Sequence, residues 1–155
     1  MSQAGTEGLG RSVTPLTLGL ATFGDVAPGT GGAEMGQALR DRGEEGGLAG
    51  RVRVDHFVIG EHHRGDFAVS TPEVVLSAIA ARTDRIRLGS GVTVLSSDDP
   101  VRVYERFATL DGVSGGRAEI QVGRGSFAEP FALFGYDLAD YVVLFDEKLD
   151  LLARL

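Results

Sequence analysis

The chain contains no cysteine. Disulfide bonds, thiolate metal sites and cysteine nucleophiles are therefore excluded, and redox chemistry would need a bound cofactor. No apolar run approaches the roughly 18 residues of a membrane span, and the N-terminal segment MSQAGTEGLGRSVTP lacks the apolar core of a signal peptide. We therefore expect a cytoplasmic protein that does not associate with membranes.

Basic residues are also scarce, since 15 Lys and Arg stand against 22 Asp and Glu, which gives a formal net charge of -7. Nucleic-acid binding draws on clustered basic side chains, so no nucleic-acid partner is expected. With 43% hydrophobic and 24% charged residues, the composition is that of one globular unit. We expect residues 1–14, which are small and polar, to form a flexible leader, and residues 15–155 to form a single domain.

Short apolar runs alternate with helical patterns along the rest of the chain. The predicted strands are 16–20, 52–60, 86–95 and 118–122, and the predicted helices are 33–50, 70–82, 100–110 and 141–155. This order predicts an α/β fold with parallel strands and right-handed crossovers, either a doubly wound sheet or a barrel. A full (β/α)₈ barrel takes roughly 250 residues, so four units make about half of one. The chain also stops inside its last predicted helix, which indicates a truncated domain.

Two of these helices carry residues whose interpretation depends on packing. In the helix at 33–50, Met35, Leu39 and Leu48 indicate an apolar face, but several glycines each cost about 0.5 to 1 kcal/mol relative to alanine. After the helix at 100–110, Asp111 and Arg117 flank a glycine-containing turn, and we interpret them as an ion pair or a cap rather than as chemistry.

The loop after the second predicted strand carries the polar cluster Glu61, His62 and His63. Ligands of parallel α/β folds bind at the carboxyl ends of the strands, so this cluster could supply a general base or a hydrogen-bond donor. Adjacent residues of an extended segment point in opposite directions, and the remaining histidine, His56, lies inside a strand. A metal site is therefore not expected, whereas catalysis and a purely structural role both remain open.

Two further segments place glycine where a ligand could approach the backbone. GSGVT at 89–93 interrupts a strand, which would admit a flat ring or accommodate a bulge. VGRGSF at 122–127 sets Arg124 between two glycines, so that backbone N–H groups and a guanidinium could together hold a phosphate. Neither a GxGxxG pattern nor a Walker motif is present, which argues against a nicotinamide-binding Rossmann fold.

From about residue 54 onward, and in LTLGLATFGD near the start, the sequence resembles the luciferase-like flavin-dependent monooxygenase family. The motifs are GEHHR, the run from TPEVVLSAIAARTDRIRLGSGVTVL to GRGSF, and FALFGYDLADYVVLFDEKLDLL. The resemblance implies the N-terminal half of a (β/α)₈ TIM barrel that uses reduced FMN and O₂ to oxidise a small organic substrate. A flavin reductase would supply the reduced flavin, and a homo-oligomer would be in keeping with the family. Some relatives use a deazaflavin, but SSDDPVRV and GRGSF are closer to the FMN branch.

Motif position also implies residue roles. His62 would act as the catalytic histidine, with Glu61 and His63 beside it. The remaining site residues would bind the cofactor: Gly91 and Val92 at the family's non-proline cis peptide behind the flavin ring, and Arg124, Gly125 and Ser126 at the flavin phosphate.

The sequence departs from the family in three respects. Bacterial luciferase has a reactive cysteine where this chain has Gly123, so no thiol role carries over. The first helix is unusually rich in glycine, and residues from the second half of the barrel, which complete the phosphate site, are missing. The alternative function is therefore a non-catalytic fragment or flavin-binding module that needs a partner or the missing half.

Overall fold

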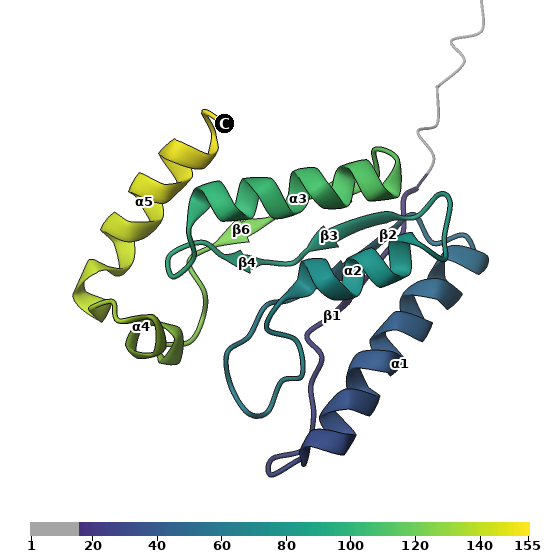
Figure 1. The fold of residues 1–155 in the computed structure, drawn as a ribbon, viewed down its shortest axis with the longest axis horizontal. Helices are drawn as coiled ribbons and strands as arrows, with labels where there is room; N and C mark the ends of the chain where they lie inside the picture. The colour runs from purple at the N-terminus through teal and green to yellow at the C-terminus, as the bar shows by residue number, and fades with distance from the viewer. Residues whose placement is uncertain (1–15) are drawn as a thin grey trace, which may run out of the picture.

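The computed structural model describes residues 16–155, so the leader expected at 1–14 lies outside the described residues. The strands are β1 (Gly19–Thr22), β2 (His56–Ile59), β3 (Arg87–Ser90), β4 (Thr93–Val94), β5 (Ala118–Glu119) and β6 (Val122–Gly123). The helices are α1 (Gly32–Arg51), α2 (Pro72–Ala80), α3 (Pro100–Ser114), α4 (Glu129–Phe134) and α5 (Tyr141–Leu152), with the 3₁₀ helix η1 (Leu138–Asp140) before α5 (Figure 1). The sequence had not predicted α4 and η1.

The strands form a parallel sheet in the order β1-β2-β3-β5, as the alternating pattern predicted. Each of the last two predicted strands is divided, so that β4 and β6 continue β3 and β5 as a separate parallel pair. The Ser90 hydroxyl lies at this division, where it donates to the Gln121 carbonyl at 3.1 Å and accepts from the Gln121 N–H at 3.3 Å. Helices α4 and α5 lie beyond β4 and β6 (Figure 1).

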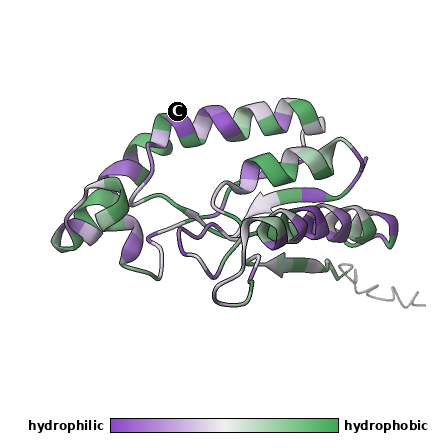
Figure 2. Ribbon diagram, turned by 60° about the horizontal axis from the view of Figure 1, so that its bottom comes forward, coloured by the Kyte–Doolittle hydropathy of each residue, from purple (hydrophilic) through white to green (hydrophobic). Residues whose placement is uncertain are grey.

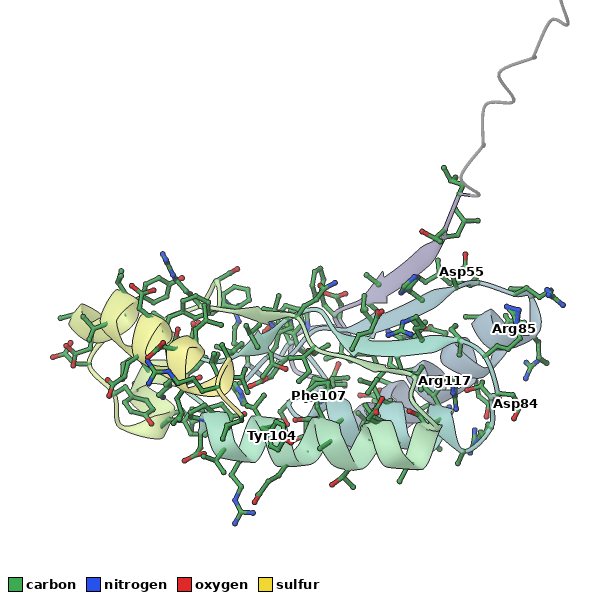
Figure 3. All side chains as sticks on the ribbon, turned by 90° about the horizontal axis from the view of Figure 1, so that it is seen from above. Asp55, Asp84, Arg85, Tyr104, Phe107 and Arg117 are labelled. Carbon is green, nitrogen blue, oxygen red and sulfur yellow. The ribbon has the colours of Figure 1, made fainter. Side chains whose placement is uncertain are left out.

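The core lies between the sheet and the helices. Phe57, Ile59 and Leu88 are almost fully buried there, and the predicted inward residues of α3 join them: Val103, Phe107 and Leu110. Figure 3 shows Phe107 on the side of α3 that faces the sheet. Among residues 16–155, no helix has both the length and the apolar character needed to cross a bilayer.

Strand β1 forms one edge of the sheet and lies further along the chain than the predicted 16–20. Its register is set by pairing with β2, Gly19 opposite His56 and Thr22 opposite Ile59. Before it, the Leu18 N–H donates to the Asp55 carboxylate at 2.8 Å instead of to a neighbouring strand. Leu18 and Leu20 are exposed, so that β1 forms a hydrophobic edge (Figure 2).

The predicted glycine-rich helix is present as α1, but the apolar face expected for it is wrong. Leu39 and Leu48 are exposed, whereas Gly46 is buried. A Cβ at Gly46 would lie 2.4 Å from Cδ1 of Ile79 in α2. Because only glycine fits at this contact, Gly46, one of the glycines that weaken the helical pattern, allows α1 and α2 to approach each other closely.

Asp111 and Arg117 cap backbone groups and do not form the ion pair that the sequence also allowed. The Asp111 carboxylate accepts from the Ala118 N–H at 3.1 Å. The Arg117 side chain is buried between α3 and the sheet (Figure 3) and donates to four carbonyls, those of Ala80, Thr83, Ile86 and Ser114. Arg117 therefore provides hydrogen-bond donors for backbone carbonyls at the end of α2 and just before β3.

The substitution Gly46→Ala should destabilise the chain by about 1 to 3 kcal/mol, because the added methyl overlaps Ile79 in a packed core. The matched control is Gly43→Ala in the same helix, where a Cβ meets nothing within 4 Å. This control should gain up to about 1 kcal/mol from helix propensity. Urea unfolding of both variants measures the difference, and equal midpoints would contradict the close helix contact.

Candidate functional site

The carboxyl ends of the strands enclose a pocket of about 460 Å³. All the site residues predicted from the sequence line this pocket: Glu61, His62, His63, Gly91, Val92, Arg124, Gly125 and Ser126. A groove of similar size, about 470 Å³, lies between α1 and α2. That groove is apolar, contains no histidine and lies away from the strand ends, where parallel α/β folds bind ligands. The pocket at the strand ends is therefore the candidate site.

Glu61 links the backbone of this pocket to one histidine. Its side chain is only 6% exposed, and its Oε2 accepts from the Val94 N–H at 3.0 Å. Its Oε1 lies 2.6 Å from Nε2 of His63, while its own N–H donates to the Val92 carbonyl at 3.2 Å. A buried carboxylate needs such partners, because an uncompensated charge is costly in a low-dielectric interior. Glu61 thus fastens the end of β2 to Val92 and to β4, and it also holds His63 in place.

His62 lies apart from that pair, in an aromatic enclosure. Its ring stacks on Phe67 with a centroid distance of 4.0 Å, and it meets the edges of Phe23 at 5.4 Å and Phe127 at 5.5 Å. The His62 N–H donates to the Val69 carbonyl at 3.0 Å, which fixes the backbone. Nε2 is buried and has no hydrogen-bond partner among the described residues. A buried polar atom without a partner is unusual, and it marks Nε2 as a candidate contact for a ligand.

Burial lowers the pKa of His62 below its ordinary value of 6.5. The carboxylates of Asp25, Glu61 and Asp66 act in the opposite direction, and His63 adds to the lowering. Desolvation wins because the phenylalanine rings provide no dipoles that would replace the water around an imidazolium. His62 is thus neutral at pH 7 and offers either a lone pair or a proton at Nε2.

Glycine shapes one wall of the pocket. A Cβ at Gly60 would lie 2.5 Å from the Phe23 ring, and one at Gly123 would lie 2.7 Å from Val92. The peptide between Gly91 and Val92 is cis, as the family resemblance implied. Glycine at Gly60 and Gly123 thus leaves room for Phe23 and Val92 to pack directly against the backbone.

The glycine-rich loop after β6 closes the other side. Gly125 has a φ of +81°, and its carbonyl accepts from the Tyr141 hydroxyl at 2.7 Å. Within residues 16–155, the N–H groups of Gly125 and Ser126 donate no hydrogen bond. Arg124 is half exposed, 5.3 Å from the Phe145 ring and 3.9 Å from Asp146. Free N–H groups beside a weakly paired guanidinium are suited to an anion.

Sequence reasoning missed the aromatic residues of the site. Phe23, Phe67 and Phe127 belong to three different loops, and Tyr141 begins α5. Phe127 ends the GRGSF motif, which was the available signal, whereas nothing local to Phe67 indicates a stack on His62. No group of three or more potential metal-ligating His, Asp or Glu side chains occurs in the described part of the chain.

Comparison with known proteins gives a consistent family match. The model of a family described as luciferase-like monooxygenase matches residues 16–155. The 4-hydroxyprotoasukamycin monooxygenase of Streptomyces nodosus subsp. asukaensis is 40% identical over 98 residues, which are 63% of this chain and 26% of that protein. The chain spans only 26% to 37% of the length of these curated relatives.

Solved structures agree on the fold. A monooxygenase from Streptomyces bottropensis has a TM-score of 0.78 at 27% identity, over 90% of this chain and 42% of that one. The oxygenating constituent of 3,6-diketocamphane monooxygenase from Pseudomonas putida, solved in complex with FMN, has a TM-score of 0.80 at 20% identity, over 90% and 38%. The described residues are thus an α/β half barrel.

The substitution Phe67→Ala should raise the pKa of His62 toward 6.5, because water would reach the exposed ring face. NMR titration of the imidazole carbon-bound protons measures this shift. The matched control is Phe134→Ala, which removes the ring 4.9 Å from His63 and should leave the His62 titration unchanged. An unchanged His62 titration in Phe67→Ala would contradict the desolvation argument.

The lowered pKa of His62 also predicts how the stability of the wild type depends on pH. Between the lowered pKa and 6.5, the unfolded state binds more protons than the folded state, so the free energy of unfolding should decrease as pH falls through that window.

The substitution Glu61→Gln should cost about 1 to 3 kcal/mol of stability, because it removes the charge from the hydrogen bonds to Val94 and His63. Glu45→Gln is the control, since Glu45 is an exposed partner of Arg42 within α1. That change should stay within about 0.5 kcal/mol. Urea unfolding midpoints at pH 7 provide the comparison. Equal losses of stability in both variants would contradict the role of Glu61 in joining β2 to β4.

Proposed function

The chain belongs to the luciferase-like monooxygenase family, and on that premise we propose that it forms the flavin-binding and histidine-bearing part of an FMN-dependent monooxygenase. One observation carries the proposal: the residues of separate loops line a single pocket that combines an unpartnered histidine nitrogen with a glycine-lined wall and a loop suited to an anion. The whole reaction would oxidise a small organic substrate with O₂, and a flavin reductase would provide the reduced flavin.

The residues of the pocket fit the parts of FMN. The part of the pocket lined by Gly91, Val92 and Gly123 would accept the flat ring, because glycine lets a ligand approach the backbone closely. The free N–H groups of Gly125 and Ser126, with the Arg124 guanidinium, would hold the phosphate. Bound reduced flavin would supply two electrons, so that one oxygen atom of O₂ enters the substrate and the other leaves as water.

His62 would make the direct polar contact with the reacting groups. Its Nε2 lies in an enclosure that excludes water, and its lowered pKa keeps the ring neutral at pH 7, so it can accept or donate one proton at that atom. We assign Glu61 and His63 a supporting role, because both are already engaged with each other and with the backbone of the pocket wall. Nucleic acid and membrane have no part in this proposal.

A second proposal is a flavin-binding module that does not turn over substrate on its own. It is favoured by the exposed apolar edge at Leu18 and Leu20. Pairing between copies or with a further part of the barrel would cover that edge. The two proposals share the flavin site and differ only in turnover.

Titration of the 155-residue chain with FMN, followed by flavin fluorescence, tests the shared site. We expect micromolar binding, and Arg124→Ala should weaken it roughly tenfold, the typical effect of losing one charge-assisted contact. Arg102→Ala, an exposed arginine on α3, is the control and should bind as the wild type does. Titration with a deazaflavin cofactor in parallel decides between the two cofactor classes.

Lack of FMN binding by the folded wild type would contradict both proposals. If FMN binds, assays of oxygen consumption with an apolar test substrate separate them. Turnover that is lost in His62→Ala would support the monooxygenase, whereas binding without turnover would support the module.

A further inference from the structure

Arg64 follows the two histidines and lies where two loops of the pocket meet. Its Nε and Nη2 donate to the two carboxylate oxygens of Asp66, at 2.9 and 3.0 Å. Its Nη1 lies 3.3 Å from the carboxylate of Glu129, the first residue of α4. Its guanidinium carbon lies 4.4 Å from the centroid of the Phe127 ring. One side chain thus contacts the loop after β2 and the loop after β6.

Phe127 contacts both this guanidinium and the enclosed histidine. Its ring centroid is 5.5 Å from that of His62 and 5.8 Å from that of Phe67, which stacks on His62. Phe127 also ends the loop whose N–H groups line the pocket. The position of this one ring therefore affects both the enclosure of His62 and the glycine-rich loop.

We infer that Arg64 is a positioning residue, which ties the loop after β2 to the loop after β6 and so holds Phe127 against His62. Nothing in the contacts themselves involves flavin, so the inference rests on the proposed function only for its consequence in cofactor binding. The planar guanidinium suits this task, because its edge can hold carboxylates while its face covers an aromatic ring.

Stability is not the main contribution of Arg64. Its side chain is 32% exposed, and ion pairs open to solvent usually contribute little to stability. Two of its nitrogens nevertheless donate to Asp66 and the third lies near Glu129, so the plane of the guanidinium has little freedom to rotate. A lysine at this position would keep the charge but could not reproduce that fork.

Charge and geometry can be separated at His62. The charged groups that face His62 are Asp25 from the loop after β1 and Glu61, His63 and Asp66 from its own loop. Loss of the Arg64 charge would leave Asp66 uncompensated and would itself raise the pKa of His62. Loss of the fork alone would raise it by letting Phe127 move and water enter.

The experiment compares Arg64→Met and Arg64→Lys with the wild-type chain by NMR. Arg102→Met is the matched control, because Arg102 is an exposed arginine that pairs with Glu105 inside α3. Two readouts are taken for each variant: the nuclear Overhauser contact between the His62 and Phe127 rings, and the pH titration of His62. Amide dispersion and urea unfolding verify that each variant is folded.

We expect the contact between the rings to weaken and the His62 titration to move toward 6.5 in both Arg64 variants, and neither to change in Arg102→Met. If Arg64→Met does not fold, Arg64→Lys alone decides the question. A wild-type ring contact and titration in Arg64→Lys would overturn the inference, because charge without the fork would then be sufficient.

FMN titration of the same variants keeps the inference distinct from the proposed function. Arg64→Met should bind FMN roughly two- to fivefold more weakly, the range of one exposed cation–π contact. If the folded wild type binds no FMN, the proposed function fails while the ring contact and titration still test Arg64. If FMN binds but the ring contact persists in both Arg64 variants, the positioning role fails and the flavin site stands.

Discussion

The buried carboxylate of Glu61 is the constraint on which the rest of the pocket depends. It accepts from the Val94 N–H, contacts Nε2 of His63 and is nearly excluded from solvent. A charge in this place is stable only while all its partners stay fixed, since leaving it unpaired costs several kcal/mol. The end of β2, the kinked segment after β3 and one histidine are therefore held in a single arrangement.

In that arrangement the two adjacent histidines have different surroundings. His63 faces the carboxylate, so its ring is occupied by the structure. His62 points in the opposite direction, as consecutive residues of an extended segment do, into three phenylalanine rings that lower its pKa. The same backbone thus presents a hydrogen-bonded carboxylate–histidine pair on one side and a neutral, unpartnered imidazole nitrogen on the other.

Parallel strands explain why residues so far apart in sequence meet here. Every strand ends at the same edge of the sheet, so the loops after β1, β2, β4 and β6 converge there. Glycine then decides how closely they approach: Gly60 admits the Phe23 ring and Gly123 admits Val92 at distances that a Cβ would forbid. Arg64 joins two of these loops from outside, where its guanidinium covers Phe127.

The sequence by itself determined the parallel α/β order, the family and eight of the fourteen residues that line the pocket, because hydrophobic periodicity and ordered motifs are local properties of the chain. Only the tertiary structure decided which partners those residues have. The glycine face of α1, the four carbonyls around Arg117 and the stack of Phe67 on His62 all join segments distant in sequence. Local patterns assigned the apolar face of α1 to Leu39 and Leu48, which are exposed. Periodicity identifies a buried face by its hydrophobic side chains. It therefore cannot identify the contact of Gly46 with Ile79, which requires that there be no side chain at all.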